Sequence, residues 1–347
     1  MQWEDEIMIK NVLNRQLNIV LKLVHSRRRS KDLAIFKCLL NGNKFSMIDI
    51  GASGGSQSRW SRFSPQVDSW SVEPDVRSRD ELIGDKSNED NGINKIIYDA
   101  LSDHDGYIDL YLTRDPQKTS VFRPNYEIIG KFPDSKNYDV VDMINIKCSS
   151  LDSIIQKNSL AFDFLKIDTQ GSELSILQGG AIALKGILGI EVEIEFAEIY
   201  ENQPLFTDVY LYLVEQGFEI LDFVYLSRWG NYKFSGLGKL MFGDAVFLRN
   251  PESMVESATN ATEGFTLIRR YIALLFVYRQ YDLILHVLDL CMQSSLVLES
   301  DALPIKKMIM EKQKSVHALQ KIINILNRFI NEKSSNEPTS PHLSLNI

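Results

Sequence analysis

The sequence has little cysteine, no excess of basic residues and no long apolar run. Its three cysteines, Cys38, Cys148 and Cys291, are scattered over 347 residues without paired spacing. This spacing fits neither a disulfide framework nor a zinc site, and it favours a reducing compartment. With 38 lysines and arginines against 46 aspartates and glutamates, the net charge is −8, which predicts no nucleic-acid partner.

Segments that could enter a membrane are also lacking. The first ten residues, MQWEDEIMIK, are acidic where a secretion signal would be basic. The longest strongly apolar run, Tyr271 to Tyr278, is too short to cross a bilayer. We therefore expect a cytoplasmic protein without a transmembrane segment. The basic residues up to Arg27–Arg29 leave peripheral contact with an anionic membrane as an alternative to a solvated helix face.

The chain divides into four parts by its pattern. Residues 1–40 carry apolar positions at spacings of three and four, which predicts a helical N-terminal extension. Residues 41–250 alternate β-rich runs with helical patterns, which is typical of βαβ units and a mostly parallel sheet. Residues 251–331 are predicted to form a helical C-terminal extension, and the polar residues 332–347 a disordered tail.

Nine strands are predicted in the middle part, and two of them show how the sheet is covered. The segments around Ile48 and Leu165 are mostly apolar, as expected where helices cover both faces of a sheet. In contrast, Glu191, Glu193 and Glu195 alternate with apolar residues, so their strand has one polar face. The nine predicted strands are Phe45–Gly51, Ser69–Glu73, Lys95–Tyr98, Tyr107–Thr113, Ile144–Cys148, Phe162–Asp168, Gly189–Phe196, Phe218–Tyr225 and Asp244–Leu248.

The first strand is followed by a glycine-rich turn, Asp49-Ile-Gly51-Ala-Ser-Gly-Gly55. Glycine allows a sharp turn and close approach to a ligand, although loop geometry alone is an alternative reason for it. Glu73 ends the next strand 22 residues after Gly51, the spacing at which an acid reaches ribose hydroxyls. The third glycine of a dinucleotide site is absent, which favours S-adenosylmethionine over a dinucleotide. A third strand precedes Asp99, which is placed to meet an adenine edge or to serve only as a turn residue.

The most specific segment is DFLKIDTQGSELSILQG, from Asp163 to Gly179. It resembles the K-I-D-x-E-G-x-E-x-x-x-L-x-G signature of the FkbM methyltransferase family. The resemblance spans roughly Ser46 to Arg249 and covers neither extension. Other segments that resemble this family are D-I-G-A-x-x-G from Asp49, V-E-P from Val72, T-S-V-F-R-P-N around Ser120, S-L-D-S from Ser150, E-I-E-F from Glu193 and Y-E-N-Q-P-L-F from Tyr200.

This resemblance implies a Rossmann-like class I methyltransferase fold with a seven-stranded sheet, in which the last strand, Asp244–Leu248, is antiparallel. It also implies S-adenosylmethionine as cofactor and O-methylation of a hydroxyl on a sugar, glycan or related metabolite. Ser120 would lie on the loop that covers the cleft, and Asp168 beside the donor methyl. The residues predicted to bind the cofactor are Asp49, Gly51, Ala52, Gly55, Glu73, Pro74, Asp99, Ala100, Leu101 and Ser120.

A base is expected, because a sugar hydroxyl is weakly acidic. The candidates are Asp168, Glu193 and Glu195, with Asp168 preferred, although it could instead cap the next helix. Gln170 stands where the family signature has a second acid, and an amide cannot accept that proton. A metal held by Asp168 and Glu193 lacks support from ligand spacing, so no metal is predicted. His104 is better explained as a solvated turn residue than as the base.

The acceptor is predicted to bind where aromatic and polar residues lie near the same edge, because this mixture suits a sugar ring. The residues concerned are Tyr126, Tyr200, Gln203, Arg228 and Trp229; packing of the Arg228–Trp229 loop on the core is the alternative. Two other functions stay open, a nicotinamide-dependent oxidoreductase and a non-catalytic module that keeps this fold. A stripe formed by Val316, Leu319, Ile323, Leu326 and Ile330 suits a bundle helix or a homodimer contact.

Overall fold

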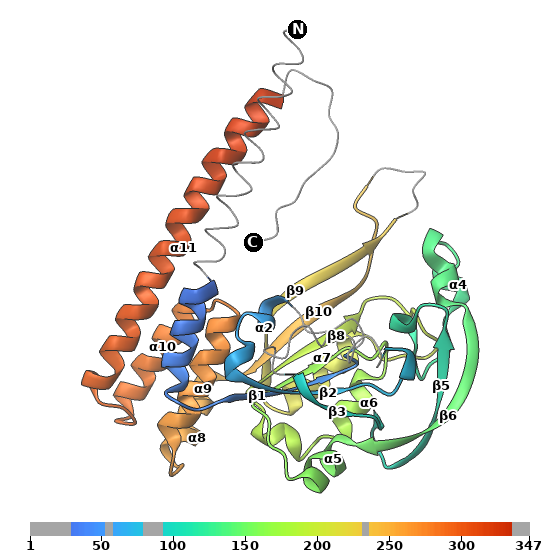
Figure 1. Cartoon of the computed structure of the whole chain (residues 1–347), viewed down its shortest axis with the longest axis horizontal. Coiled ribbons are helices and arrows are strands. Elements are labelled where there is room, and N and C mark those ends of the chain that lie inside the picture. The colour runs from blue at the N-terminus through green and yellow to red at the C-terminus, as the bar shows by residue number, and fades with distance from the viewer. Residues whose placement is uncertain (1–28, 53–57, 79–92, 231–235, 335–347) are drawn as a thin grey trace.

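A seven-stranded sheet organises the protein (Figure 1), and the computed structural model describes residues 29–52, 58–78, 93–230 and 236–334. The strand order is β3-β2-β1-β7-β8-β10-β9, and β10 is antiparallel to both of its neighbours. This confirms the predicted sheet with its antiparallel last strand. The strands are β1 Phe45–Ile50, β2 Val67–Val72, β3 Ile93–Ile97, β7 Phe164–Ile167, β8 Gly189–Glu195, β9 Phe218–Trp229 and β10 Lys239–Arg249.

One face of the sheet is apolar along its whole length. Ile48, Ile50, Leu165, Ile167 and Val192 point to this face and belong to one buried cluster. The helices that pack on it are α5 Leu151–Asn158, α6 Glu173–Gln178 and α7 Phe206–Glu215. This burial explains why the central strands have apolar residues at consecutive positions: the alternate residues meet a second covered face.

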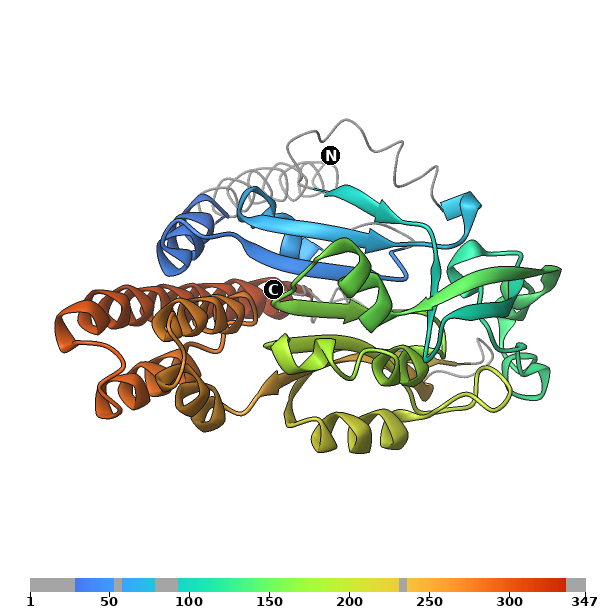
Figure 2. The same cartoon turned by 90° about the horizontal axis from the view of Figure 1, so that it is seen from below.

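The opposite face changes from apolar to charged along the strands. At its apolar end Met47, Phe164 and Val246 pack against the C-terminal helices. Further along, Asp49 and Lys166 lie beside each other in the strand register, and Lys166 lies beside Glu191. The C-terminal helices, which Figure 2 shows beside this end of the sheet, are α8 Pro251–Thr259, α9 Gly264–Val277, α10 Tyr281–Gln293 and α11 Glu299–Ser334.

A second sheet of three strands has the order β4-β6-β5. Its strands are β4 Ala100–Ser102, β5 Gly106–Thr113 and β6 Val140–Ser150. The strands predicted at Tyr107–Thr113 and Ile144–Cys148 exist, but they pair with each other here and not in the main sheet. Alternation identifies a strand without identifying its partner, which is why the sequence did not separate the two sheets.

The remaining elements are short. Before the second strand lie α2 Ser58–Ser61 and η1 Ser64–Gln66, and between β5 and β6 lie η3 Pro116–Lys118, α4 Tyr126–Ile129 and η4 Pro133–Tyr138. Residues 29–40 are helical and pack on the C-terminal helices through Phe36 and Leu39. The rest of the predicted N-terminal helix, 1–28, and tail residues 335–347 lie outside the described residues.

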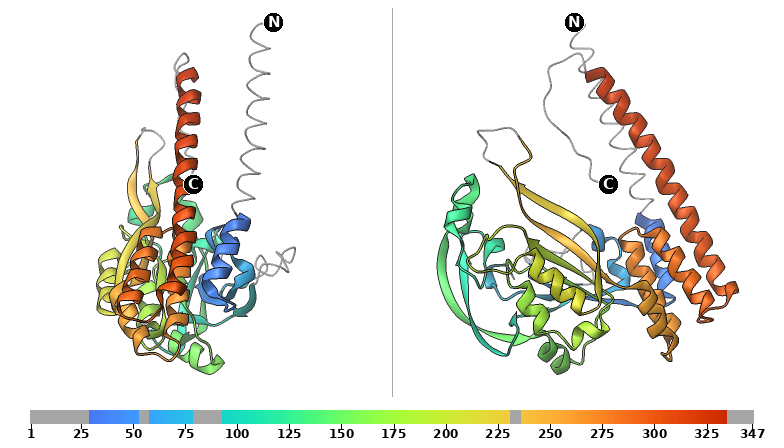
Figure 3. Two further views of the ribbon diagram at one scale, coloured as in Figure 1. Left: turned by 90° about the vertical axis from the view of Figure 1, so that its left-hand side faces the viewer. Right: turned by 180° about the vertical axis from the view of Figure 1, so that it is seen from behind.

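The long helix α11 projects away from the sheet (Figure 3). Val316 of the predicted apolar stripe packs against the core of the C-terminal helices, whereas the side chains of the other four stripe residues are outside the described set. No described helix combines the length and apolar composition needed to span a membrane.

Candidate active site

A cavity of about 220 Å³ opens at the carboxyl ends of β1, β2, β7 and β8. Ligands of open α/β sheets bind at this edge because the strand ends and the following loops converge there. Among the residues predicted from the sequence, those that line the cavity are Gly51, Glu73, Pro74, Ala100, Leu101, Asp168 and Glu193. The structure therefore brings together five of the ten predicted cofactor residues and two of the three candidate bases.

The turn after β1 is held tightly against the turn after β7. Gly51 has a φ of +79°, and a Cβ at this position would lie 1.7 Å from the carbonyl oxygen of Asp168. The Asp168 N–H also donates to the Ile50 carbonyl at 2.9 Å. Glycine is thus required here by the neighbouring backbone as well as by the left-handed conformation. This contact fixes Asp168 relative to the glycine turn.

Glu73 is held in the wall of the cavity at the end of β2. Its side chain is 4% exposed, and its Oε1 accepts a hydrogen bond from the Asp75 N–H at 2.8 Å. Asp75 pairs with Arg77 at 2.6 Å, and Arg77 also donates to the Thr113 carbonyl of β5 at 2.8 Å. These bonds connect the acidic end of β2 to the second sheet, so Glu73 lies in a fixed position.

Gln170 joins the two carboxylates that face the cavity. Its Nε2 donates to Asp168 Oδ1 at 3.2 Å and to Glu193 Oε2 at 2.7 Å. Its Oε1 accepts from the Tyr200 hydroxyl at 2.9 Å. Because an amide both donates and accepts, it satisfies these three groups without adding charge. This gives a physical reason for a glutamine where the family signature has an acid.

Replacing this amide by a carboxylate should destabilise the protein. We expect Gln170→Glu to lower the free energy of unfolding by about 1–3 kcal/mol, because the donor between Asp168 and Glu193 is lost and a third negative group is added. Urea unfolding at neutral pH measures this loss. The matched control is Gln178→Glu on the exposed end of α6, which should change stability little. Equal losses in both variants would contradict the bridging role of Gln170.

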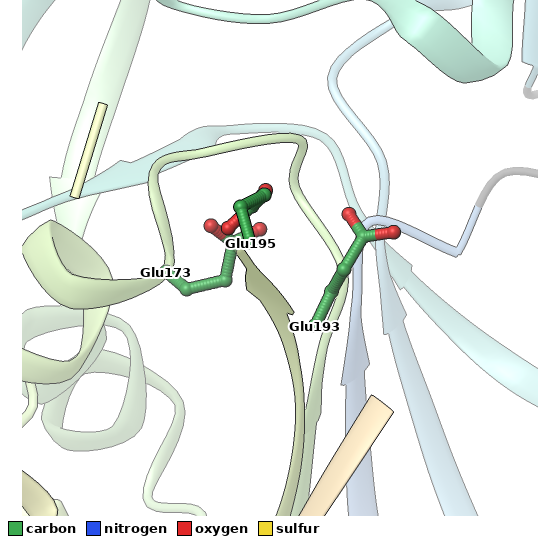
Figure 4. A group of neighbouring side chains, drawn as sticks. All are labelled: Glu173, Glu193 and Glu195. Carbon is green, nitrogen blue, oxygen red and sulfur yellow. The ribbon is translucent and has the colours of Figure 1, made fainter. Parts of the chain in front are cut away.

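Behind the cavity, Glu173 and Glu195 point toward each other, and the carboxylate of Glu193 lies to one side of that pair (Figure 4). One oxygen of each of the three lies within 4.8 Å of the others. Glu173 Oε1 accepts from the Thr169 N–H at 2.7 Å, and its Oε2 accepts from the Gly171 N–H at 2.9 Å. Glu173 therefore closes the loop after Asp168, which accounts for its burial without a metal ion.

The electrostatics of this cluster separate the three candidate bases. Burial and then the neighbouring Asp168 and Glu195 raise the pKa of Glu193 well above its usual range. Burial, followed by Glu173 and Asp168, does the same to the pKa of Glu195. Burial therefore favours the protonated form of both groups more than it would for an exposed carboxyl, and a protonated carboxyl cannot accept another proton. Asp168, whose side chain is about one-third exposed, is the best placed base of the three.

A row of charged side chains supports Asp168 from within the sheet. Lys166 Nζ lies 3.2 Å from Asp49 Oδ1 and 3.7 Å from Asp168 Oδ2. The nearby carboxylates, Asp49 first, raise the pKa of Lys166 despite the opposing effect of its burial, so it is charged. Next in the row, Glu191 is bound by Arg59 and by the Tyr278 hydroxyl, which follows α9. The C-terminal helices thereby contact the polar layer under the cavity.

The structure does not place every predicted residue in the cavity. Of the predicted cofactor residues, Asp49 lies beneath the cavity, where it pairs with Lys166, and Ala52 is buried. The Asp99 carboxylate accepts a hydrogen bond from the Ser149 hydroxyl at 3.0 Å and pairs with Lys147 at 3.2 Å. The Ser120 hydroxyl donates to the Gln170 carbonyl at 2.7 Å. Ser120 therefore stabilises the loop after Asp168 and does not line the cavity. Gly55 lies outside the described residues.

The predicted acceptor residues divide into two groups. Tyr200 and Gln203 are buried, and the Gln203 side chain accepts from the Tyr200 N–H, so they support the site from behind. Arg228 and Trp229 line a second cavity next to the first. Tyr126 is half exposed, and its hydroxyl donates to the Tyr138 carbonyl at 3.0 Å.

Sequence reasoning missed several lining residues. Lys118 and Phe242 line both cavities, and Asp244 lines the first. Burial and the nearby Asp168 raise the pKa of Asp244 to about 7. Phe242 and Asp244 are on β10, whose antiparallel direction brings its first half to this edge. Asp244 was predicted only as the first residue of the last strand, Phe242 lies before the predicted start of that strand, and Lys118 lies two residues before the motif serine.

The sheet with its inserted antiparallel strand and the acidic cavity at its carboxyl edge define the class of Rossmann-like, S-adenosylmethionine-dependent methyltransferases. Within that class, residues 49–220 match the family model described as the methyltransferase FkbM domain, so the chain carries an FkbM-type methyltransferase domain. No curated protein sequence matched the chain.

The comparison with solved structures matched methyltransferases at low sequence identity and at TM-scores below 0.5. Magnesium protoporphyrin IX methyltransferase from Synechocystis PCC 6803 with bound SAM is 8% identical at a TM-score of 0.33, over 66% of this chain and 82% of that one. Precorrin-6y C5,15-methyltransferase from Geobacter metallireducens GS-15 is 12% identical at 0.31, over 64% and 88%. An S-adenosylmethionine-dependent methyltransferase from Clostridium acetobutylicum is 12% identical at 0.30, over 68% and 98%.

Proposed function

We propose that the protein transfers the methyl group of S-adenosylmethionine to a hydroxyl of a sugar, glycan or related metabolite, with Asp168 as the base. The observation that carries this proposal is the convergence of Gly51, Glu73 and Asp168 on one cavity. In-line transfer needs the acceptor oxygen on the line opposite the sulfur, and such positioning contributes about 7–11 kcal/mol in favourable intramolecular models.

The charge of the cavity supports a cationic donor. Among its described lining residues, five are acidic, and Lys118 is the basic one. S-adenosylmethionine carries a sulfonium and an ammonium group, both of which favour acidic surroundings. The five acidic residues are Glu73, Asp75, Asp168, Glu193 and Asp244. A nicotinamide cofactor would instead bring a pyrophosphate, which such a wall repels.

Glu73 is proposed to bind the ribose hydroxyls of the donor. It ends β2 beside the glycine turn, its carboxylate is fixed by the Asp75 N–H, and the cavity lies in front of it. Pro74, Ala100 and Leu101 line the same part of the cavity and are proposed to contact the nucleoside. This proposed role agrees with the 22-residue spacing from Gly51 to Glu73. β1 and β2 are neighbouring parallel strands, so the turns that follow them lie at the same edge of the sheet.

The donor site is tested by Glu73→Ala. We expect the affinity for S-adenosylmethionine to fall about 10- to 100-fold, since hydrogen bonds to a charged group contribute about 1.5–3 kcal/mol. Isothermal titration calorimetry measures the change. Glu215→Ala, on the exposed end of α7, is the control and should bind the donor like the wild type. Unchanged affinity in Glu73→Ala would contradict the ribose placement, and no binding by the wild type would contradict the proposed function.

The catalytic unit is proposed to extend over residues 41–250, beyond the matched family domain. β9 continues past Ile220 to Trp229, and β10 completes the sheet between β8 and β9. Without β10, strand β9 would have no partner in the sheet, and Phe242 and Asp244 would be missing from the cavity. A shorter unit would therefore lack part of both the core and the site.

A further inference from the structure

We propose that the methyl acceptor carries an anionic group, a carboxylate or a phosphate, which binds in the second cavity between Lys118 and Arg228. This inference rests on the proposed function, because it identifies the chemical class of the acceptor. The second cavity has a volume of about 300 Å³. It is lined by the segment Phe132–Tyr138, by Arg228 and Trp229 at the end of β9, and by Phe242 of β10.

The two cavities meet at shared residues. Lys118 and Phe242 line both of them, so a molecule in the second cavity lies next to the donor cavity. Lys118 Nζ is 5.8 Å from the centre of the Phe242 ring. The Lys118 carbonyl accepts from the Tyr200 hydroxyl at 3.0 Å, and Tyr200 also binds Gln170. The lysine is therefore anchored to the same network that holds Asp168.

Aromatic rings form one wall of the second cavity. The Trp229 ring lies 5.2 Å from Phe132, 5.8 Å from Tyr138 and 6.2 Å from Phe242, measured between ring centres. The Tyr126 hydroxyl donates to the Tyr138 carbonyl and accepts from a backbone N–H of β6, which fixes this wall from outside. Apolar ring faces with a few polar groups suit the apolar face of a sugar ring.

The charges of the second cavity are opposite to those of the first. It is lined by Lys118 and Arg228 on the positive side and by Asp134 on the negative side. Within the described part of the chain, neither Lys118 nor Arg228 has a carboxylate within ion-pair distance. The protein as a whole carries a charge of −8. Lys118 acts on Glu193 of the first cavity, and Asp134 also lines the second cavity, but among the described residues neither cation there is held in a direct ion pair. Two such cations in one cavity of an acidic protein indicate an anionic ligand, for which arginine offers a bidentate fork.

The size of this arrangement fits a modified monosaccharide. The anionic group would be bound in the second cavity, the ring would contact Trp229, and one hydroxyl would extend toward Asp168. Lys118 lines both cavities, so its charge would neutralise the anion on the side that faces the acidic donor cavity. A neutral sugar would leave Arg228 without a direct ion pair, so the site favours an acidic sugar.

The test uses matched sugars with the full-length protein in the presence of S-adenosylhomocysteine, the product left by the donor. Glucuronate, glucose 6-phosphate and glucose are titrated separately, and Trp229 fluorescence reports binding in the second cavity. Trp229→Phe keeps a ring there and identifies the signal that belongs to this tryptophan. We expect glucuronate or glucose 6-phosphate to bind at least about 10-fold more tightly than glucose, as charge-assisted hydrogen bonds predict. Which of the two anions binds more tightly distinguishes a carboxylate from a phosphate.

Two variants determine where the anion binds. Lys118→Gln and Arg228→Gln should each remove most of the preference for the charged sugars, whereas Lys185→Gln, an exposed lysine elsewhere, should keep it. Equal affinity of the wild type for charged and neutral sugars, or a preference that both variants retain, overturns the proposal. Absence of any binding by the charged sugars overturns it as well. Calorimetry with S-adenosylmethionine on the same samples tests the donor site by itself. A failure of the acceptor proposal can therefore be distinguished from a failure of the proposed function.

Discussion

Asp168→Asn is expected to lower the rate of methyl transfer by about 10²- to 10⁴-fold, the range that general-base catalysis contributes. The asparagine keeps an oxygen that can accept from Gln170 Nε2, and it keeps the shape of the side chain. It cannot take a proton from the acceptor hydroxyl. Since the change leaves Glu73 and the glycine turn in place, the affinity for S-adenosylmethionine should stay within about 3-fold of the wild type. The measurement is transfer of a tritiated methyl group to the carbohydrate acceptor.

The matched control for this variant is Glu193→Gln. Burial and the neighbouring Asp168 raise the pKa of Glu193, which favours its protonated form, and glutamine resembles that form in shape and charge. Its rate should therefore fall far less than that of Asp168→Asn. If Glu193→Gln lost more activity than Asp168→Asn, the base would be Glu193, and the assignment made from burial and charge would be wrong.

Lys166→Met is expected to lower the free energy of unfolding by about 3–5 kcal/mol, the usual cost of removing one partner of a buried ion pair. Lys166 is 7% exposed, and its replacement leaves the buried Asp49 carboxylate without a cationic partner. Asp168 loses the same ion-pair partner. Burial raises the pKa of Asp49 in the folded protein. The loss should therefore become smaller as the pH falls and Asp49 takes up a proton. Urea unfolding at two pH values measures both effects.

Lys147→Met provides the comparison, because Lys147 lies at the same 3.2 Å distance from a carboxylate, that of Asp99, but is mostly exposed. Exposed ion pairs contribute about 0–1 kcal/mol, so this variant should be nearly as stable as the wild type. The double variant Lys166→Met with Asp49→Asn should recover much of the lost stability, since no unpaired buried charge is left there. Equal stability of the two single variants would contradict the role given to the charged row.

The charged row also extends the site beyond the residues matched by the family domain. Tyr278, which follows α9, binds Glu191 in β8, and Glu191 is beside Lys166 in the strand register. The sequence predicted helices after Pro251 but not that they contact the layer beneath the cavity. Periodicity shows which face of a helix is apolar, and it does not show which surface that face covers.

Local rules predicted much of the fold. Apolar runs bounded by turn residues predicted the strands of the main sheet, and the glycines from Gly51 onward predicted a sharp turn after the first of them. The place of Glu73 at a strand end was also predicted, because parallel strands of similar length end at one edge. These are properties of short segments, so the amino-acid order was enough to determine them.

Other features depend on contacts between distant segments, and only the tertiary structure decided them. The second sheet, the bridge from Gln170 to Glu193 and the cavity shared by Lys118 and Phe242 join residues far apart in the chain. The raised pKa of Glu193 follows from burial and from neighbouring carboxylates, which a sequence does not place. Composition and spacing therefore determined the elements and the glycine turn, whereas the folded chain decided which carboxyl groups are buried and have raised pKa values.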